Sequence, residues 1–454
     1  MYFPHIQEAP VCSIRIQIRA RELILVWVES SIRIFLAVIF FLAAGLATSS
    51  ALAKWFSLQE TPEGFRNAIR FAPWNAEYYA GMARALERPL KPQNLIEVIH
   101  HYEKAVQLGP RDAAYWSRLG NAYEWAGREP DAQHAYARAL SLSPGSPAVN
   151  WVAANFYLRE GAPDRALELL RKTILLDPDL RRPAFDLAWR AIQDGELIAG
   201  EMIPSRPDVH FEYLRYLVET GRIDEATAAW NRAVERGYPL DPKTAFPYMD
   251  ALIQFHRTNA LKDAWSAMTG SDPSLMETGK NDSNLLVNGG FEGEILNGGM
   301  DWRMDSVQGA AITMDRAAPF ERTRSLEIKF DGSQNPADAL VYEYVPVEPN
   351  TSYSFSGYMR GLDITTNSGP RFEICDADVP ARLFIQTEGV LGSSSWTMRQ
   401  LNFRTGPETQ LLMLRVTRPA SGKFARRISG TVWVDQLELH VDEKSFLNAG
   451  ERNE

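Results

Sequence analysis

The chain has 454 residues, of which 45% are apolar and 23% charged, as in globular rather than disordered proteins. Its formal net charge of -9 argues against nucleic-acid binding, which needs clustered Lys and Arg to neutralise phosphates. Two cysteines are too few for a disulfide scaffold, and the motifs CxxC, HExxH, GxxxxGK[ST] and GxSxG are absent, which removes the usual starting points for zinc enzymes, P-loop nucleotidases and serine hydrolases.

The first predicted element is an apolar helix at residues 34–53, IFLAVIFFLAAGLATSSALA, which contains no charged residue. At 1.5 Å per residue this run spans about 30 Å, the thickness of the hydrocarbon core of a bilayer. The residues before it carry four arginines, which favour a cytoplasmic N-terminus: Arg15, Arg19, Arg21 and Arg33. We therefore expect a cytoplasmic segment at 1–33 and a single signal anchor in the cytoplasmic membrane, with the bulk of the chain periplasmic or otherwise extracytoplasmic.

A cleaved secretory signal is the alternative, because Ala51-Leu52-Ala53 matches an A-x-A cleavage site. The 33 residues that precede the apolar run are long for such a signal, and this favours an uncleaved anchor. Both interpretations deliver the remaining chain to the same side of the membrane. With an anchor, Cys12 and Cys375 lie on opposite sides and cannot pair, so Cys375 is expected to be a small buried side chain in a strand.

A helical pattern with a repeat fills residues 54–275. Its best copy, residues 113–144, combines large, small and proline residues at eight positions: Trp116, Leu119, Gly120, Tyr123, Ala132, Tyr136, Ala139 and Pro144. This combination resembles the tetratricopeptide repeat (TPR), a unit of two antiparallel helices. Pro110, Pro144 and Pro178 are spaced by 34 residues, which is the length of that repeat.

Each such unit has an apolar stripe that it cannot bury alone, so the units are expected to stack into an all-α solenoid. Small residues such as Gly120 and Ala132 let the paired helices approach closely, and Trp116, Tyr123 and Tyr136 fill the space between them. Stacked repeats present a concave groove that commonly binds peptides or proteins. We therefore expect a protein partner in this groove, although the repeats do not identify it.

After a polar linker at 276–283, the pattern changes at residues 284–443 to short alternating segments between Gly, Pro and Asn, followed by a tail at 444–454. This pattern predicts an antiparallel β-sandwich of jelly-roll size. Its first segment, NLLVNGGFE, and its last, GTVWVDQLEL, resemble the ends of carbohydrate-binding modules of the galactose-binding-like jelly-roll type. The whole chain is thus expected to be a multidomain α + β protein: one transmembrane helix, a TPR solenoid and a β-sandwich.

The resemblance implies a glycan ligand and a structural calcium ion, with Glu292 and Asp435 at the positions that help to hold it. In the last strand, Asp435 has the same parity as Trp433, Leu437 and Leu439, so it is expected to face the buried side. A carboxylate there needs a cation or several backbone N–H donors. The alternative is that Asp435 accepts hydrogen bonds from the crossing first strand.

A sugar-binding face is expected where the outward residues of three strands adjoin: Tyr358, Arg360, Arg371, Glu373 and Arg415. An ordinary solvated sheet face has the same composition, so this alternative stays open. Trp302, Trp396 and Trp433 are interpreted as core residues because they lie within or beside apolar runs, and the absence of an obvious exposed Trp is compatible with a module that kept the fold and lost sugar binding.

Three functions compete. The leading one is an adaptor whose repeats bind proteins and whose sandwich binds a glycan, in the assembly or export of a bacterial surface polysaccharide, a context that rests on domain combination alone. The second is a non-catalytic scaffold whose sandwich caps the repeats or contacts proteins; a flat face of paired Arg and Glu would favour it. A glycosidase needs two carboxyl groups across a cleft, and no pair stands out, so we expect no enzyme and no required cofactor.

Overall fold

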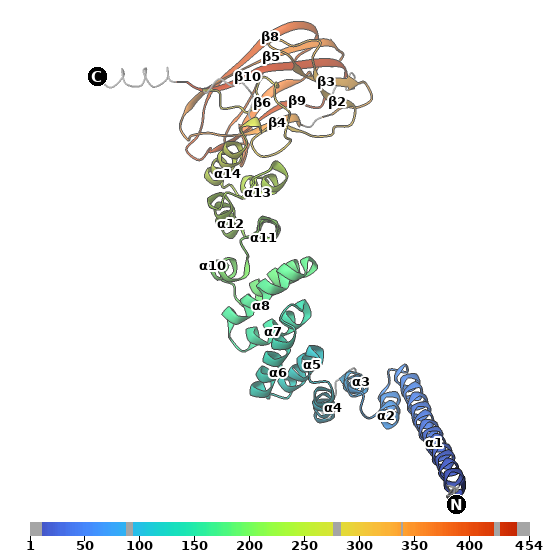
Figure 1. Ribbon diagram of the computed structural model, residues 1–454. Coiled ribbons are helices and arrows are strands. Elements are labelled where there is room, and N and C mark those ends of the chain that lie inside the picture. The colour runs from blue at the N-terminus through green and yellow to red at the C-terminus, as the bar shows by residue number, and fades with distance from the viewer. Residues whose placement is uncertain (1–10, 88–93, 276–282, 337–338, 422–426, 443–454) are drawn as a thin grey trace, which may run out of the picture. The chain divides into compact units, whose positions relative to one another are not determined.

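The computed structural model describes residues 11–87, 94–275, 283–336, 339–421 and 427–442. The first ten residues, nearly all of the predicted linker at 276–283 and the predicted tail at 444–454 lie outside these ranges. The chain forms helices followed by two antiparallel sheets (Figure 1). It divides into two compact units, Met1–Ala184 and Phe185–Glu454. The second unit therefore contains both the last helices and the sheets.

Helix α1 (Val11–Ser57) contains the predicted membrane anchor. Its part from Ser30 to Ser57 is long and apolar enough, by length and composition, to cross a membrane, and none of the apolar window is buried within the protein. The helix continues without interruption through Ala51-Leu52-Ala53. Ala53 is fully buried in a small cluster with Ala68, Ala72 and Tyr78, so the end of α1 belongs to the folded helical region.

The first unit continues as a series of helices: α2 (Pro62–Phe71), α3 (Ala76–Glu87), α4 (Leu95–Leu108), α5 (Ala113–Trp125), α6 (Glu129–Leu142), α7 (Pro147–Arg159), α8 (Pro163–Leu176) and the 3-10 turn η2 (Pro178–Leu180). Neighbours pair as α3 with α4, α5 with α6 and α7 with α8. Pro110, Pro144 and Pro178 each follow the second helix of a pair, where a residue without N–H cannot extend the helix. The 34-residue spacing is therefore the spacing of helix pairs.

Side chains at the repeat positions lie largely between paired helices. Leu119, Gly120, Ala132, Tyr136 and Ala139 are buried, Trp116 and Tyr123 are half-buried, and Pro144 is exposed. A Cβ atom at Gly120 would lie 3.0 Å from the Tyr136 ring, which explains the small residue there. The Tyr136 ring also packs on Phe156 of the next pair, with ring centroids 4.9 Å apart.

Helix α9 (Arg181–Ala191) contains the division between the units. The repeat is then interrupted by α10 (Gly195–Leu197) and the π-helical turn η3 (Ile198–Met202), where the sequence pattern also breaks. The remaining helices of the second unit are α11 (Pro207–Glu219), α12 (Ile223–Glu235), α13 (Pro242–Gln254), α14 (Thr258–Ser271) and the 3-10 turn η4 (Pro273–Leu275). They carry the same helix-pair arrangement, with α11 beside α12 and α13 beside α14.

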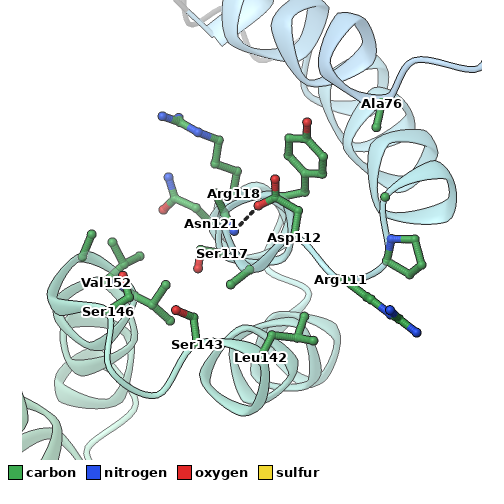
Figure 2. Close-up of a pocket in the computed structure, with 17 residues that line it drawn as sticks. Ala76, Arg111, Asp112, Ser117, Arg118, Asn121, Leu142, Ser143, Ser146 and Val152 are labelled. Atoms are coloured by element: carbon green, nitrogen blue, oxygen red, sulfur yellow. Dashed lines mark hydrogen bonds between the residues drawn. The ribbon is translucent and has the colours of Figure 1, made fainter.

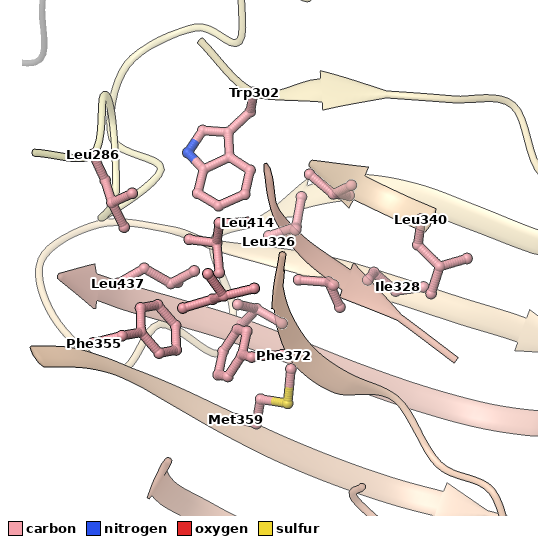
Figure 3. Packing of buried hydrophobic residues seen from close by; sticks show 14 of the residues in the cluster. Leu286, Trp302, Leu326, Ile328, Leu340, Phe355, Met359, Phe372, Leu414 and Leu437 are labelled. Carbon is pink, nitrogen blue, oxygen red and sulfur yellow. The ribbon is translucent and has the colours of Figure 1, made fainter. Parts of the chain in front are cut away.

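The strands of the described residues are β1 (Arg303–Met304), β2 (Ala310–Asp315), β3 (Ser325–Asp331), β4 (Ala339–Pro346), β5 (Ser352–Ile364), β6 (Arg371–Asp376), β7 (Phe384–Gln386), β8 (Gly392–Arg404), β9 (Leu411–Thr417) and β10 (Ser429–Val441). They form two five-stranded antiparallel sheets, in the orders β1-β4-β9-β6-β7 (sheet A) and β2-β3-β10-β5-β8 (sheet B). The inner faces of both sheets meet in one apolar core, which includes Phe355, Phe372 and Leu414 (Figure 3).

The opening stretch of this domain, residues 284–292, forms no strand but is hydrogen-bonded to β10. The Leu285 N–H donates to the Leu439 carbonyl at 2.9 Å, and the Leu437 N–H donates to the Gly289 carbonyl at 2.9 Å. A Cβ atom at Gly289 would lie 2.2 Å from the Leu437 carbonyl oxygen, so only glycine permits this approach. The Asn and Gly residues of this stretch thus join the beginning of the domain to its end.

The predicted orientation of Asp435 is wrong, because β10 contains a bulge between Asp435 and Glu438. The bulge includes Gln436, with a positive φ of 51°, and it reverses which parity faces the core. Val432 and Val434 face the core before the bulge, and Leu437 and Leu439 face it afterwards. Asp435 therefore lies on the outer side of sheet B, where it is nevertheless 1% exposed.

Candidate functional site

A concavity in the first unit lies beside α5 and α7 and has a volume of 1130 Å³ (Figure 2). Its wall from α5 includes Tyr115, Arg118 and Asn121, which lie on one helix face at intervals of three residues. Val149 and Val152 of α7 form the apolar wall of the lining, and Figure 2 shows Val152 on the α7 side. This combination of an apolar wall with a few polar groups is typical of a ligand-binding concavity.

Helix caps fix the entrances of this groove. The Asp112 carboxylate accepts a hydrogen bond from the Ala114 N–H at 2.8 Å, which begins α5. Ser146 caps α7 in the same way, with its hydroxyl 3.4 Å from the Val149 N–H. The guanidinium groups of Arg111 and Arg118 are exposed at the groove, beside the capping carboxylate of Asp112.

The side chains beside the groove form one hydrogen-bonded group, around Glu77, and one ion pair, between Arg118 and Glu87. The Tyr115 hydroxyl donates to Glu77 at 2.9 Å, and Arg84 also contacts this carboxylate. Burial opposes ionisation of Glu77, but the hydrogen bonds from Arg84 and Tyr115 outweigh it and lower its pKa. Arg118 lies 3.8 Å from Glu87 and keeps 48% of its side chain exposed, so it remains available to a ligand.

The five residues of the predicted sugar face do not adjoin. Tyr358 and Arg360 lie on β5 in sheet B, whereas Arg371, Glu373 and Arg415 lie on β6 and β9 in sheet A. The expectation of a single polar face is therefore wrong. Parity within each strand is as predicted, since Met359, Phe372 and Leu414 face the core and their neighbours face outward.

On sheet A the outward residues form an ion pair rather than an open site. Arg415 Nε donates to the Glu373 carboxylate at 2.6 Å, and Glu373 is only 4% exposed. Arg371 lies beside this pair and its guanidinium is 3.4 Å from the Gln386 amide oxygen. Cys375 is buried, as the sequence predicts for a strand residue. Such a paired Arg/Glu surface favours the scaffold alternative.

Sheet B has an aromatic outer face that the sequence did not reveal. The Phe320 ring stacks on Tyr358 with centroids 3.8 Å apart, and it also contacts the Trp396 ring at 5.7 Å. The Arg360 guanidinium lies 4.9 Å from the centre of the Trp433 ring. A pocket of 460 Å³ beside this cluster is lined by Arg360, Trp396 and three serines, Ser393, Ser394 and Ser395.

Of the three tryptophans expected in the core, only Trp302 packs between the sheets, where it is fully buried (Figure 3). Trp433 is 7% exposed but lies on the outer face, with its Nε1 donating to Asp315 at 2.8 Å. Trp396 is half-buried on β8, at the edge of sheet B. The apolar run around each residue gave no sign of this difference, because the run does not show on which side of a sheet an aromatic lies.

Glu292 and Asp435, the two carboxylates implied to hold calcium, both bind the segment before β3. Glu292 accepts from the Thr323 N–H at 2.8 Å and the Arg324 N–H at 3.2 Å. Asp435 accepts from the N–H groups of Phe320 at 2.8 Å, Glu321 at 3.2 Å and Gln436 at 2.7 Å. Among the described residues, no group of three or more His, Cys, Asp and Glu side chains is placed to hold a metal ion. Calcium stays a prediction.

The carboxylates of Glu343, Asp376 and Asp378 each have a separate structural partner. Glu343 accepts from the Val287 N–H at 2.7 Å, and Asp376 accepts from the Asp378 and Val379 N–H groups at 2.9 and 2.8 Å. Asp376 therefore stabilises the bend that follows β6. Asp378 itself is 2.5 Å from His256 Nδ1 in the loop after α13.

The sandwich also contacts α13 and α14, the last helix pair of the second unit. Capping of the repeats is an alternative that the sequence allows, but the sequence does not identify the contact residues. Arg303 at the start of sheet A donates to Asp250 of α13 at 2.6 Å, and its guanidinium lies 5.0 Å from the Tyr344 ring centre. Gly299 has a positive φ of 59°, and a Cβ atom there would lie 2.6 Å from the Trp265 ring of α14. The loop before β1 therefore fits closely against α13 and α14.

Comparison with known proteins identifies part of the helical region. A family model described as tetratricopeptide repeat matches residues 126–188. No curated protein matches the chain. One similar solved structure is the crystal structure of MamA, with 20% sequence identity, coverage of 39% of this chain and 86% of that chain, and a TM-score of 0.28. Another is the crystal structure of YrrB, described as a TPR protein with an unusual peptide-binding site, with 16% identity, coverage of 47% of this chain and 94% of that chain, and a TM-score of 0.23. A third is the enzymatically active domain of bacteriophage CBA120 tailspike protein 4, with 12% identity, coverage of 35% of this chain and 22% of that chain, and a TM-score of 0.26.

Proposed function

We propose that this protein is a membrane-anchored, extracytoplasmic scaffold whose repeat groove binds an extended segment of a partner protein. The observation that carries the proposal is the 1130 Å³ groove between α5 and α7, with an apolar wall and exposed arginines. The TPR family match covers α6, α7 and α8, which supports a repeat of the protein-binding kind at this place. No step of this function requires catalysis.

Two features support an uncleaved anchor over a cleaved signal. The helix runs unbroken through the A-x-A sequence, and Ala53 at its end is fully buried against α2 and α3. Cleavage after Ala53 would remove a residue from the folded protein and would need this helical segment to become extended. We therefore place the bulk of the chain outside the cytoplasm, tethered by α1.

The partner segment is expected to carry an acidic group near Arg118. Arg111 and Arg118 both line the groove, and Asn121 offers both a donor and an acceptor to a peptide backbone. Hydrogen bonds between a guanidinium and a carboxylate are among the stronger ones in proteins. The valines of α7 would contact an apolar side chain of the same segment.

This proposal is tested with peptides selected from a random library on the full-length protein in lipid nanodiscs. Affinity is then measured by fluorescence anisotropy for the unchanged protein, Arg118→Glu and the control Arg138→Glu, which alters an exposed arginine of α6 outside the groove. We expect Arg118→Glu to weaken binding by roughly tenfold or more, because it replaces attraction by repulsion. Equal affinities for the two variants would contradict the groove as the binding site.

A glycan ligand for the sandwich is the second candidate. It is favoured by the aromatic outer face of sheet B, where Arg360 and Trp396 line a pocket that also offers serine hydroxyls. The proposed site includes Arg360 in the pocket lining and Tyr358 in the adjoining aromatic cluster, and it leaves out the three residues on sheet A. A glycan in this position would connect the scaffold to surface polysaccharide assembly or export.

Glycan-array binding of the full chain is the corresponding measurement, with Trp396→Ala as the test and Met398→Ala as the control. Met398 lies on the same strand and is 51% exposed, but it does not line the pocket. We expect Trp396→Ala alone to abolish binding, because stacking on the indole ring would be lost. Array binding that is absent with and without calcium would favour the non-catalytic scaffold whose sandwich contacts proteins.

A further inference from the structure

The first helix after the anchor runs back along it. A Cβ atom at Gly64 would lie 2.6 Å from the Phe56 carbonyl oxygen, Ala68 packs in one cluster with Ala53, and the Ser49 hydroxyl donates to the Phe71 carbonyl at 2.5 Å. As numbers rise along α2, the contacted residues of α1 fall from 56 to 49. Helix α2 is therefore antiparallel to α1 and returns toward the apolar run.

This register places the turn after α2 beside the apolar run itself. Ser49 precedes Ala53, the predicted end of the span, by four residues, or about 6 Å along the helix. The turn at residues 72–75 follows Phe71 and continues in the same direction. It is closed by the Asn75 N–H, which donates to the Ala72 carbonyl at 3.2 Å, and by Asn75 Oδ1, which accepts from the Glu77 N–H at 3.0 Å.

We propose that this turn and the adjoining face of α1 and α2 lie in the headgroup region of the outer leaflet and bind anionic lipid there. The inference rests on the membrane anchoring proposed above. It also moves the exit of α1 from the hydrocarbon to near Ser49, because a polar turn with Asn75 cannot lie in hydrocarbon without leaving backbone groups unsatisfied.

Exposed aromatic side chains support this placement. Trp55 is 59% exposed at the end of α1, and Trp74 is 53% exposed in the turn itself. Trp is enriched at membrane–water interfaces because its ring is apolar and its N–H is polar. Leu58, 67% exposed, adds apolar surface next to Trp55. Exposure of these apolar side chains to water is unfavourable, whereas insertion into the membrane–water interface would remove their apolar surface from water.

The charges of the same region have a matching order. Arg66 and Arg70 are exposed on α2, and Arg70 adjoins the turn. The exposed acids Glu60 and Glu63 are at or before the other end of α2, farther from the apolar run. Lys54 is exposed on α1. One exposed acid, Glu77, also lies beside the turn, but its carboxylate is paired with Arg84. The basic side chains of Lys54, Arg66 and Arg70 would therefore be attracted by anionic lipid headgroups.

The test uses the full-length chain with Cys12→Ser, in nanodiscs of phosphatidylcholine and phosphatidylglycerol. An environment-sensitive fluorophore is attached to Trp74→Cys or Trp55→Cys, and its quenching by lipids with a spin label near the headgroup is recorded. The control is Trp125→Cys on α5, since Trp125 is also exposed (44%) but lies outside the region. We expect blue-shifted emission and loss of most of the fluorescence at positions 74 and 55, and neither effect at position 125.

Two outcomes separate this inference from the proposed anchoring. If the chain resists alkaline extraction from membranes but position 74 is quenched no more than position 125, the interfacial placement is wrong and the anchor stands. If the chain is extracted, the anchoring itself is wrong. Nanodiscs of phosphatidylcholine alone test the lipid charge, and equal quenching in both lipid mixtures would overturn binding to anionic lipid. Circular dichroism confirms that each labelled variant is folded.

Discussion

Asp435 illustrates how a single buried carboxylate joins distant parts of the sandwich. Its oxygens accept three backbone N–H groups, two of them from residues more than 110 positions earlier in the chain. Burial nevertheless raises its pKa to about 6, from a reference value of 3.8, and the charge of nearby Glu292 acts in the same direction. The carboxylate is thus held in place by hydrogen bonds while its ionised form is disfavoured.

The first prediction concerns the pH dependence of this group. Because the folded-state pKa lies above the unfolded one, the folded protein holds the proton more tightly, and the free energy of unfolding falls as pH rises from about 4 to about 6. Asp435→Asn removes this contribution, so the unchanged protein should lose about 2 kcal/mol relative to the variant across that interval. Chemical denaturation of both proteins in detergent, at a series of pH values, measures the difference.

Asp301 needs to be controlled in that experiment, because burial also raises its pKa to about 6 and its effect has the same sign. It is present in both proteins and cancels in the comparison. The variant Asp301→Asn provides a second reference, and it should leave the contribution of Asp435 intact. Stability curves of the unchanged protein and Asp435→Asn that run parallel from pH 4 to 7 would contradict the prediction.

The second prediction uses two glycines with nearly equal backbone conformation. Gly299 and Gly392 have φ values of 59° and 60°, so alanine causes similar backbone strain at both. Only at Gly299 would the new methyl group collide, with Trp265 of α14. Gly299→Ala should therefore lower the free energy of unfolding by about 1–3 kcal/mol more than Gly392→Ala, as judged by chemical denaturation. Equal losses would mean that the loop before β1 does not pack on α14 in solution.

At the scale of elements, the sequence predicted what local patterns determine. The repeat positions from Trp116 to Pro144 indicated helix pairs because every unit needs the same large and small residues at its helix contacts. The alternation of apolar and polar residues after residue 284 indicated strands. Prediction from the sequence failed where one residue changes the course of a strand, and where strands that are distant in the sequence lie side by side. The bulge at Gln436 reversed the side on which Asp435 lies, and the pairing order of the strands separated Tyr358 from Glu373. The bulge shows in the register between β10 and β5, and the pairing order depends on contacts between strands, so alternation along one strand predicts neither.

The third prediction compares two aromatic residues of one helix pair. Tyr136 of α6 is fully buried and contacts Phe156 of α7, whereas Trp125 at the end of α5 is 44% exposed. Tyr136→Ala should therefore lower the free energy of unfolding by about 3–5 kcal/mol, and Trp125→Ala by less than about 1 kcal/mol. Helical circular dichroism during urea titration reports both. A cost for Trp125→Ala as large as that for Tyr136→Ala would show that the repeats do not stack through the Tyr136 ring.

For the whole molecule, the structure assigns the sandwich to the same compact unit as the last helices. Arg303 with Asp250, and Lys262 with Glu348 at 3.3 Å, connect the two parts. A solenoid needs a polar or covered end, because its last repeat otherwise exposes an apolar face. The sandwich supplies that cover for α13 and α14, so it has a structural role whether or not it also binds a glycan.

The last prediction concerns the direction in which the chain crosses the membrane. The arginines before the apolar run are expected to hold the N-terminus in the cytoplasm, so a C-terminal alkaline phosphatase fusion should be active and a C-terminal fluorescent protein of the kind that folds only in the cytoplasm should be dark. Replacing Arg15, Arg19 and Arg21 by Glu weakens the orientation signal. Part of the population should then insert with the C-terminus in the cytoplasm, which lowers phosphatase activity and gives fluorescence. The same fusions joined after Ser30 lack the span and serve as the cytoplasmic control. A fluorescent full-length fusion with inactive phosphatase would overturn both the topology and the extracytoplasmic scaffold that depends on it.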